Sequence, residues 1–318
     1  MASYRPLTSR QAPPPLSHAE PPLLLHSLVL LRREILGSLE IVGARRIVEI
    51  GSESGGFTVD LEAWASRNDA FVVSVDPDPA PAVVELGERS PHLDLVAVPS
   101  PEALRELEPA DVYIVDGDHN YATVSAELTQ ALANGNHALV VLHDVGWPAA
   151  RRDQYYAPER IDREARHEHS FHGGVKPGRS QLGPDGFRGA GSFAWAEHEG
   201  GPRNGVLTAV EDFMATEPGL RLMRVPCIFG VGFLYPEAAS WADRLTAFLE
   251  PFHENPLLRT MEENRTALYV RVLDLQDDEA QRLRADRVIT GFHDEIGELE
   301  AADARRSLAA TEASGPTP

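Results

Sequence analysis

Short apolar runs alternate with helical patterns between residues 46 and 142, and this alternation limits the possible folds more than any other feature. Between the runs, apolar residues recur at helical spacing, as at Phe57, Leu61 and Trp64. Alternating strands and helices predict an α/β fold with a parallel sheet and helices on both faces. The five runs that have the length of buried strands are 46–50, 71–76, 93–98, 111–116 and 138–142.

The flanking segments have other patterns. Apolar positions recur at helical spacing from Leu24 to Leu39, which predicts a helix before the core. Residues 220–226 and 228–235 predict an antiparallel strand pair, and residues 241–249 a helix. We therefore divide the chain into a flexible proline-rich tail (1–22), a cofactor-binding core (23–145), a lid or substrate insertion (146–205), the end of the core with a strand hairpin (206–256), a helical extension (257–300) and a second flexible tail (301–318).

Charge and cysteine content exclude several classes of protein. The chain has 318 residues, with 49 acidic against 29 basic ones, and a formal net charge of -20. Such a charge argues against bulk affinity for nucleic acid or for an anionic membrane. The most apolar stretch, 23–31, has nine residues, whereas a membrane span needs about twenty. A single cysteine, Cys227, excludes an internal disulfide and fits a cytoplasmic location.

A glycine-rich turn follows the first predicted strand, from Glu49 to Thr58. Gly51 allows a sharp turn, and Gly55 and Gly56 leave room for a close ligand. The Gly-x-x-x-Gly spacing argues against the pyrophosphate site of an NAD-binding enzyme and favours a ligand with an amino-acid part beside a nucleoside. Asp76 ends the second strand, where a carboxylate can accept hydrogen bonds from both ribose hydroxyls. The alternative is a plain tight turn with an exposed acid.

Acids and a histidine follow the next strands at the same edge of the predicted sheet. Asp116 and Asp118 leave the fourth strand, and His143 and Asp144 leave the fifth. Three converging carboxylates repel one another, and a divalent cation, Mg²⁺ or Mn²⁺, would relieve this. In the alternative, the site is free of metal and His143 is a base or a structural residue. Asp116, His143 and His119 are the candidate catalytic bases.

The segment 48–58, Asp76 and the run 116–121 (Asp-Gly-Asp-His-Asn-Tyr) together resemble class I S-adenosylmethionine-dependent methyltransferases. The closest group is that of macrocin-type sugar O-methyltransferases and cephalosporin-hydroxylase-like proteins, which share the Asp-Gly-Asp-His-x-Tyr element. The resemblance covers residues 45–145, and more loosely the chain up to Tyr235. It implies a doubly wound, mostly parallel seven-stranded Rossmann-like sheet whose last two strands form an antiparallel hairpin.

The resemblance also implies roles for individual residues. Asp76 would bind the ribose of S-adenosylmethionine, and Ser100 lies where the family contacts adenine. Asp118 and Asp144 would be metal ligands, with Asp116 a ligand or a base that also borders the cofactor. His143 takes a ligand position that many relatives fill with an acid. The residues of the turn that would hold the methionine part are Glu49, Gly51, Ser52, Gly55 and Gly56.

The insertion at 146–205 carries side chains with several possible uses. Three histidines, His167, His169 and His172, suggest a metal site, a pH-sensitive lid or a substrate grip, or simply a solvated loop. Its aromatic residues can stack on a substrate ring or form a small core; they are Trp147, Tyr155, Tyr156, Phe171 and Trp195. Its basic residues can guide an anionic substrate; they are Arg151, Arg152, Arg160, Arg163, Arg166, Lys176 and Arg179.

The helical extension carries a narrow apolar stripe, interrupted by Arg265. A stripe of this width is typical of a two-helix contact. The partner is either the chain's own first helix or the same helix of a second subunit, which would make a homodimer. The apolar residues of the stripe are Leu258, Met261, Leu268, Val272 and Leu275.

These patterns predict an O-methyltransferase that acts on a hydroxyl of a small natural product or sugar, with or without a divalent metal. The alternatives are an N-methyltransferase for a small molecule, a non-catalytic cofactor-binding or scaffold protein, and a related fold with other chemistry.

Overall fold

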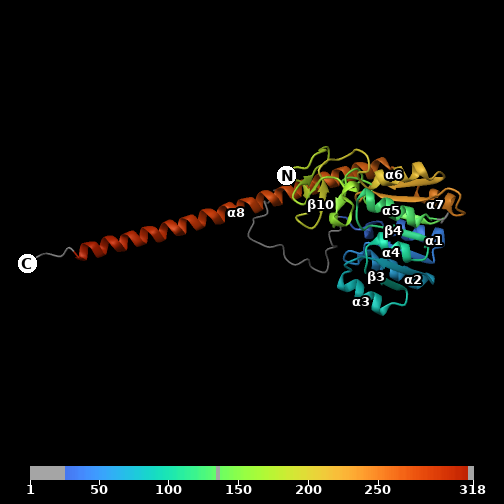
Figure 1. Ribbon diagram of the computed structural model, residues 1–318, viewed down its shortest axis with the longest axis horizontal. Helices are drawn as coiled ribbons and strands as arrows, with labels where there is room; N and C mark the ends of the chain where they lie inside the picture. The colour runs from blue at the N-terminus through green and yellow to red at the C-terminus, as the bar shows by residue number, and fades with distance from the viewer. Residues whose placement is uncertain (1–25, 134–136, 314–318) are drawn as a thin grey trace, which may run out of the picture.

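The computed structural model describes residues 26–133 and 137–313, with side chains up to residue 287 (Figure 1). The predicted proline-rich tail, 1–22, lies outside the described residues. A seven-stranded sheet has the order β11-β12-β5-β4-β1-β2-β3, and β12 runs antiparallel to both of its neighbours while the other pairs are parallel. This confirms the predicted fold class. The strands are β1 (Arg46–Ile50), β2 (Phe71–Val75), β3 (Leu93–Val96), β4 (Val112–Val115), β5 (Leu139–Leu142), β11 (Leu220–Val225) and β12 (Val231–Pro236).

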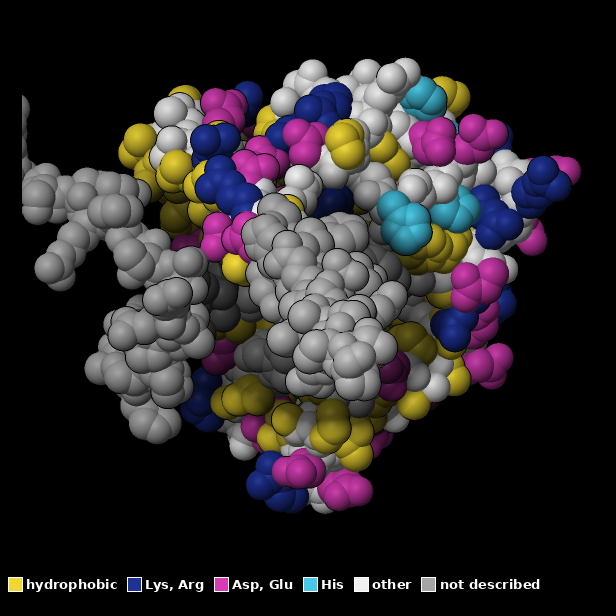
Figure 2. Space-filling view, turned by 90° about the vertical axis from the view of Figure 1, so that its left-hand side faces the viewer, with side chains coloured by type: hydrophobic (Ala, Val, Ile, Leu, Met, Phe, Trp, Pro, Cys, Tyr) yellow, Lys and Arg dark blue, Asp and Glu magenta, His cyan; other side chains and the backbone are white. Residues whose placement is uncertain are grey.

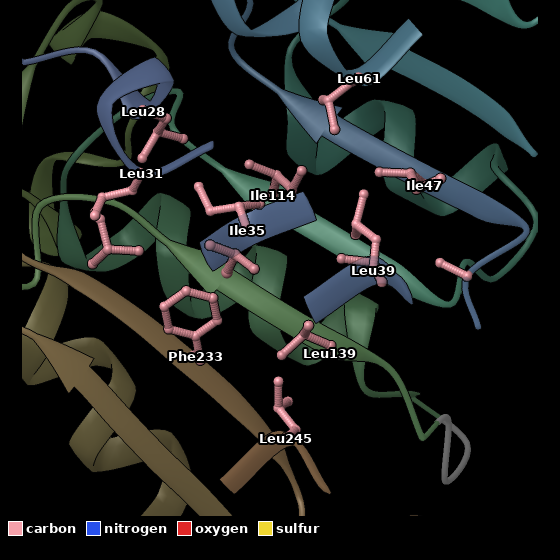
Figure 3. Packing of buried hydrophobic residues seen from close by; sticks show 14 of the residues in the cluster. Leu28, Leu31, Ile35, Leu39, Ile47, Leu61, Ile114, Leu139, Phe233 and Leu245 are labelled. Carbon is pink, nitrogen blue, oxygen red and sulfur yellow. The ribbon is translucent and has the colours of Figure 1, made fainter. Parts of the chain in front are cut away.

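Helices cover both faces of the sheet. One face packs against α1 (Arg32–Val42), α2 (Gly56–Asn68) and α7 (Ala242–Leu249), with Ile35, Leu39 and Leu245 directed at the strands (Figure 3). The other face packs against α4 (Ser100–Glu106), α5 (Tyr121–Ala131) and α6 (Val206–Thr216). Two further helical elements of the core within the described residues are η1 (Leu28–Leu31) and α3 (Pro81–Arg89).

Burial on both faces explains the uninterrupted apolar runs. Ile47 and Val48 are adjacent in β1 but belong to different hydrophobic clusters, because successive side chains of a strand point to opposite faces. Val140 and Val141 of β5 divide in the same way. A strand in this position therefore contains apolar residues throughout, which is the pattern typical of a parallel sheet covered by helices.

The insertion is ordered and has two small sheets of its own. Its Tyr155 and Trp195 are fully buried, with Trp195 packed in the hydrophobic cluster on one face of the main sheet, while Tyr156 is half exposed. One sheet has the order β6-β10-β7 and the other pairs β8 with β9. The elements are β6 (Gln154–Tyr155), η3 (Pro158–Arg160), η4 (Arg163–Ala165), β7 (His169–Ser170), β8 (Gly174–Val175), β9 (Phe187–Arg188) and β10 (Ala194–Ala196).

A buried carboxylate is one of the groups that fasten this insertion to the core. Asp153 Oδ1 accepts hydrogen bonds from the backbone N–H of Tyr121, at the start of α5, and of Gly205, at the start of α6, both at 2.7 Å. Its Oδ2 accepts one from the Tyr155 hydroxyl, also at 2.7 Å. Asp153 therefore caps two helices of the core from within the insertion.

The last helix, α8 (Pro256–Ala313), leaves the body of the molecule and extends far beyond it (Figure 1). It continues past residue 300, where the sequence predicts a flexible tail, and only residues 314–318 of that tail lie outside the described part. Up to residue 287, where the description of side chains ends, Thr266 and Val270 are its buried residues. The Tyr269 ring lies 5.4 Å from that of Phe187 in the insertion, and Lys176 of the insertion pairs with Asp274 at 2.7 Å.

The predicted stripe of α8 faces away from these contacts. Met261, Leu268, Val272 and Leu275 are exposed by 49–61%, whereas Leu258 packs against the core. Arg265 interrupts the apolar stripe because it lies on the face of α8 that contacts the body of the molecule.

Within the described residues, no helix is long and apolar enough to cross a membrane.

Candidate active site

The glycine turn brings the end of β1 against the end of β4. Gly51 has a φ of +85°, in the left-handed region that favours glycine. A Cβ atom there would lie 2.3 Å from the backbone oxygen of Asp116, so any side chain would push the two strand ends apart. Gly55 has a φ of +84° and directly precedes α2. The turn therefore needs glycine at both positions for reasons of backbone geometry.

Asp76, just after β2, is joined to the same turn. Its Oδ2 accepts hydrogen bonds from the backbone N–H and the hydroxyl of Ser52, both at 2.9 Å. Its Oδ1 accepts one from the backbone N–H of Asp78 at 2.9 Å. The carboxylate is therefore fixed beside the turn, although its contact with a ribose stays a prediction.

Glu49 lies under the turn and is only 2% exposed. One carboxylate oxygen, Oε2, accepts hydrogen bonds from the hydroxyls of Thr58 and Ser74 at 2.8 Å each. Burial raises the pKa of Glu49 to about 7, against the effect of these two hydroxyls. The same carboxyl group lines a cavity between η1, the turn and the end of β4, whose lining also includes Ser27, Leu28, Gly51, Ser52, Gly56, Phe57 and Asp116.

Four titratable side chains meet beside this cavity, at the ends of β4 and β5. The His143 Nδ1 atom lies 2.7 Å from Asp116 Oδ1 and 3.1 Å from Asp144 Oδ2. The His119 Nε2 atom lies 3.3 Å from each of the same two oxygens. Asp116, His119, His143 and Asp144 thus each offer one ligand atom within 4.8 Å of the others. We call these four residues the Asp/His cluster.

Protons are distributed unevenly within the Asp/His cluster. Burial alone would raise the pKa of Asp116, but the neighbouring His143 and His119 lower it to about 2. Burial alone would lower the pKa of His143, but Asp116 and Asp144 hold it well above its usual value. The second ring nitrogen of His143, Nε2, donates a hydrogen bond to the Ile228 carbonyl oxygen at 2.7 Å. His143 therefore carries a proton on each nitrogen and neutralises part of the carboxylate charge.

The donor set of the Asp/His cluster suits a divalent ion. Two carboxylate oxygens and two imidazole nitrogens are ligands that Mn²⁺ and Zn²⁺ accept readily, whereas Mg²⁺ prefers oxygen. Such an ion would replace the proton on His143 Nδ1, because a coordinated nitrogen must be unprotonated. The residues therefore fit a metal ion as well as a metal-free network.

Asp118 does not join the Asp/His cluster, and His119 takes the place predicted for it. The Asp118 oxygens lie 3.3 Å from the Tyr156 backbone nitrogen and 3.5 Å from the Thr123 hydroxyl. The side chain thus contacts the first turn of α5 and the insertion. Burial raises the pKa of Asp118 to about 6.

Ser100 lies at the start of α4 and donates a hydrogen bond to Glu127 of α5. Glu127 is fully buried, and burial raises its pKa to about 8. Its other carboxylate oxygen, Oε2, has no hydrogen-bond partner within the described residues. The sequence did not single out Glu127, because it sits between the apolar Val124 and Leu128 on the buried face of a helix.

The histidines of the insertion do not assemble into a metal site. His167 Nε2 bonds to the Arg203 carbonyl oxygen at 2.8 Å, and His169 Nδ1 to that of His167 at 2.9 Å. His172 is exposed. Among the described residues, the Asp/His cluster is the only group with metal-ligand geometry.

Most basic side chains of the insertion already have partners. Arg151 pairs with Glu211 and Arg179 with Asp185, both at 2.6 Å. Arg152 and Arg166 donate to backbone carbonyl oxygens. On the face shown in Figure 2, basic and acidic side chains are interspersed among the described residues. The attraction of an anionic substrate to this segment stays a prediction.

Comparisons with known proteins agree with this description. Residues 48–145 match the family described as a methyltransferase domain. Solved structures with a similar fold include an O-methyltransferase from Bacillus cereus in complex with SAH, at 16% identity and a TM-score of 0.39, covering 66% of this chain and 83% of that one. Another is O-methyltransferase TomG from Streptomyces achromogenes, involved in tomaymycin synthesis, at 17% identity and a TM-score of 0.36, covering 64% and 78%.

Likenesses of that degree carry no argument about substrate or chemistry. No curated protein matches the sequence. The family match, however, spans the glycine turn, Asp76 and all four residues of the Asp/His cluster. The part of the chain that builds the candidate site, residues 48–145, is therefore the part that matches the methyltransferase-domain family.

Proposed function

We propose that the protein transfers a methyl group from S-adenosylmethionine to a hydroxyl group of a small molecule. The observation that carries this proposal is the shared cavity, which the glycine turn, Glu49 and Asp116 line together. A ligand held by the turn would lie directly beside the Asp/His cluster. This proposal includes membership of the macrocin-type subgroup and a natural product or sugar as the acceptor. It also includes oxygen as the methylated atom and a cytoplasmic location.

The residues of the turn bind the methionine part and Asp76 binds the ribose. S-adenosylmethionine supplies a methyl group already activated by its sulfonium, so alignment of the acceptor provides most of the rate gain. Glu49 is placed to receive the ammonium group, which would favour the ionised carboxylate. Ser100 is proposed to contact the adenine, with Glu127 holding its hydroxyl in place.

Asp116 is the cluster residue that reaches the cavity, with 25% of its side chain exposed. It accepts a hydrogen bond from the acceptor hydroxyl and orients it. His119, whose Nε2 lies 3.3 Å from the same carboxylate oxygen, receives the proton in the form in which its imidazole is neutral and Nε2 carries the lone pair. His143 has both nitrogens engaged, so it orients Asp116 and does not take up a proton.

A divalent cation would be held by Asp116, Asp144, His119 Nε2 and His143 Nδ1, and would lower the pKa of the acceptor hydroxyl. His119 cannot offer one lone pair both to a cation and to a proton, so the two arrangements exclude each other. Methyl transfer that persists in chelator supports His119 as the base. Transfer that is lost in chelator and restored by Mn²⁺ or Mg²⁺ assigns the cluster to metal binding.

Cofactor binding provides the direct test of the function. Calorimetry should show that Asp76→Ala weakens S-adenosylmethionine binding tenfold or more, since a hydrogen bond to a charged group contributes about 1.5–3 kcal/mol. Asp78→Ala is the matched control, because this exposed neighbour contributes only its backbone N–H. A wild-type protein that neither binds the cofactor nor labels any acceptor with its methyl group would contradict the proposal.

A further inference from the structure

The orientation of His143 depends on one backbone carbonyl group. His143 is 3% exposed, and its Nε2 donates to the Ile228 oxygen at 2.7 Å. This bond leaves Nδ1 as the only ring nitrogen that faces Asp116 and Asp144. Outer hydrogen bonds of this kind fix which nitrogen of a histidine serves a site. Whatever places the Ile228 carbonyl therefore also places His143.

Ile228 belongs to the hairpin loop, residues 226–230, which joins β11 to β12 and has an unusual backbone. Ile228 has a φ of +54° and Phe229 a φ of +60°, although neither residue is a glycine. The left-handed region is unfavourable for a side chain branched at Cβ, such as that of Ile228. A conformation of this kind persists only where surrounding contacts hold it.

On its inner side, the hairpin loop is held by the chain after β5. Gly146 donates its N–H to the Phe229 oxygen at 2.6 Å, and Val145 donates to the Gly230 oxygen at 3.2 Å. A Cβ atom on Gly146 would lie 2.5 Å from the Phe229 oxygen, so the two segments pass as closely as backbones can. These contacts fix the distance of the loop from β5 but leave the Phe229 N–H unbonded.

On its outer side, α8 supplies the missing partner. The Glu262 Oε1 atom accepts a hydrogen bond from the Phe229 N–H at 2.9 Å. Arg265, one turn further along α8, donates to both carboxylate oxygens of Glu262 at 2.6 Å. Its guanidinium carbon also lies 4.8 Å from the centre of the Phe229 ring, within the range of a cation–π contact. Glu262 thus binds the backbone of Phe229, and Arg265 contacts its ring.

We propose that Glu262 and Arg265 are positioning residues for His143. They hold the hairpin loop in the conformation that presents the Ile228 carbonyl to His143 Nε2. Both side chains contact Phe229 of the loop or each other, so their effect on His143 passes through the loop. Only the role of the cluster in methyl transfer rests on the proposed function. The contacts that link α8 to His143 do not depend on it.

The experiment follows the His143 ring directly, in full-length protein labelled with ¹⁵N-histidine. The Nε2–H signal, assigned through its loss in His143→Gln, should exchange slowly with solvent in the wild type. Glu262→Ala should speed this exchange at least tenfold. Glu262→Gln should restore slow exchange, because the amide oxygen can accept from the Phe229 N–H. Glu263→Ala, an exposed acid at the next position of α8, is the matched control.

A second readout separates positioning from a loss of stability. In methyl-transfer assays, Glu262→Ala should lower kcat while the KM for S-adenosylmethionine stays unchanged, and Glu262→Gln should recover most of the loss. Unchanged Nε2–H exchange in Glu262→Ala, or equal exchange in the Ala and Gln variants, would overturn the inference. Because exchange is measured without substrate, it gives an answer even where no acceptor is methylated.

Discussion

Replacing Glu49 with Gln should change the pH dependence of stability by a predictable amount. The carboxyl group is 2% exposed, and burial raises its pKa from the usual 4.5 to about 7. At about 1.4 kcal/mol for each pKa unit, this rise corresponds to about 3 kcal/mol. Since the pKa in the folded protein lies above that of the unfolded chain, Glu49 contributes stability fully below pH 4.5, and this contribution is lost as the pH rises through about 7.

Urea unfolding of the wild type and of Glu49→Gln between pH 4.5 and 8 measures this effect. The amide does not titrate, so the variant should gain about 3 kcal/mol relative to the wild type over that range. Other groups that titrate cancel in the difference between the two proteins. A difference that is independent of pH would refute the argument, because it would mean that Glu49 is ionised at little cost in the folded state.

Cofactor binding provides a second test of the protonation of Glu49. If the cofactor's ammonium meets the Glu49 carboxylate, binding at pH 6 should release a proton from the wild type. Calorimetry in buffers with different heats of ionisation would detect it, and Glu49→Gln should show no such release.

Two further predictions concern the insertion and α8. Asp153→Ala should lower the free energy of unfolding by about 3 kcal/mol or more, because three donors lose a charged acceptor worth about 1.5–3 kcal/mol each. Urea unfolding measures this loss. An effect no larger than that of the exposed Asp162→Ala would contradict the prediction. The exposed stripe of α8 should pair with a second subunit, so full-length protein should sediment as a dimer and the Leu268→Lys, Leu275→Lys double variant as a monomer. A wild-type monomer would refute that prediction.

The sheet could be predicted because its strands are buried on both faces, and five of its seven strands lie between residues 46 and 142. Helices α3 and α4 were missed because neither carries a clear apolar stripe: Val83 is the only buried residue of α3, and the buried residues of α4 are Ser100, Ala103 and Leu104. The insertion gave no strand signal, since its strands have two or three residues. One of the groups that hold it in place is the buried polar Asp153, a residue type that usually lies on the surface.

The site residues that directly follow a strand could be predicted from the sequence. Asp116, His143 and Asp144 directly follow parallel strands, so topology alone brings them together. The choice between Asp118 and His119 depends on the backbone path after β4, which a sequence pattern does not specify. The Ile228 contact was beyond prediction, because a carbonyl group is present at every position and only the loop conformation selects this one.

The two caps provided by Asp153 also set the natural boundaries for recombining this protein with its relatives. An insertion that only covered a site could be exchanged at its two ends, leaving the core intact. Here, removing residues 146–205 would also remove the group that satisfies the first N–H group of α5, together with Gly205, which precedes α6 and donates to the same carboxylate. A chimera should therefore transfer the insertion together with α5 and keep Gly205, the residue before α6, on the same side of the junction as Asp153.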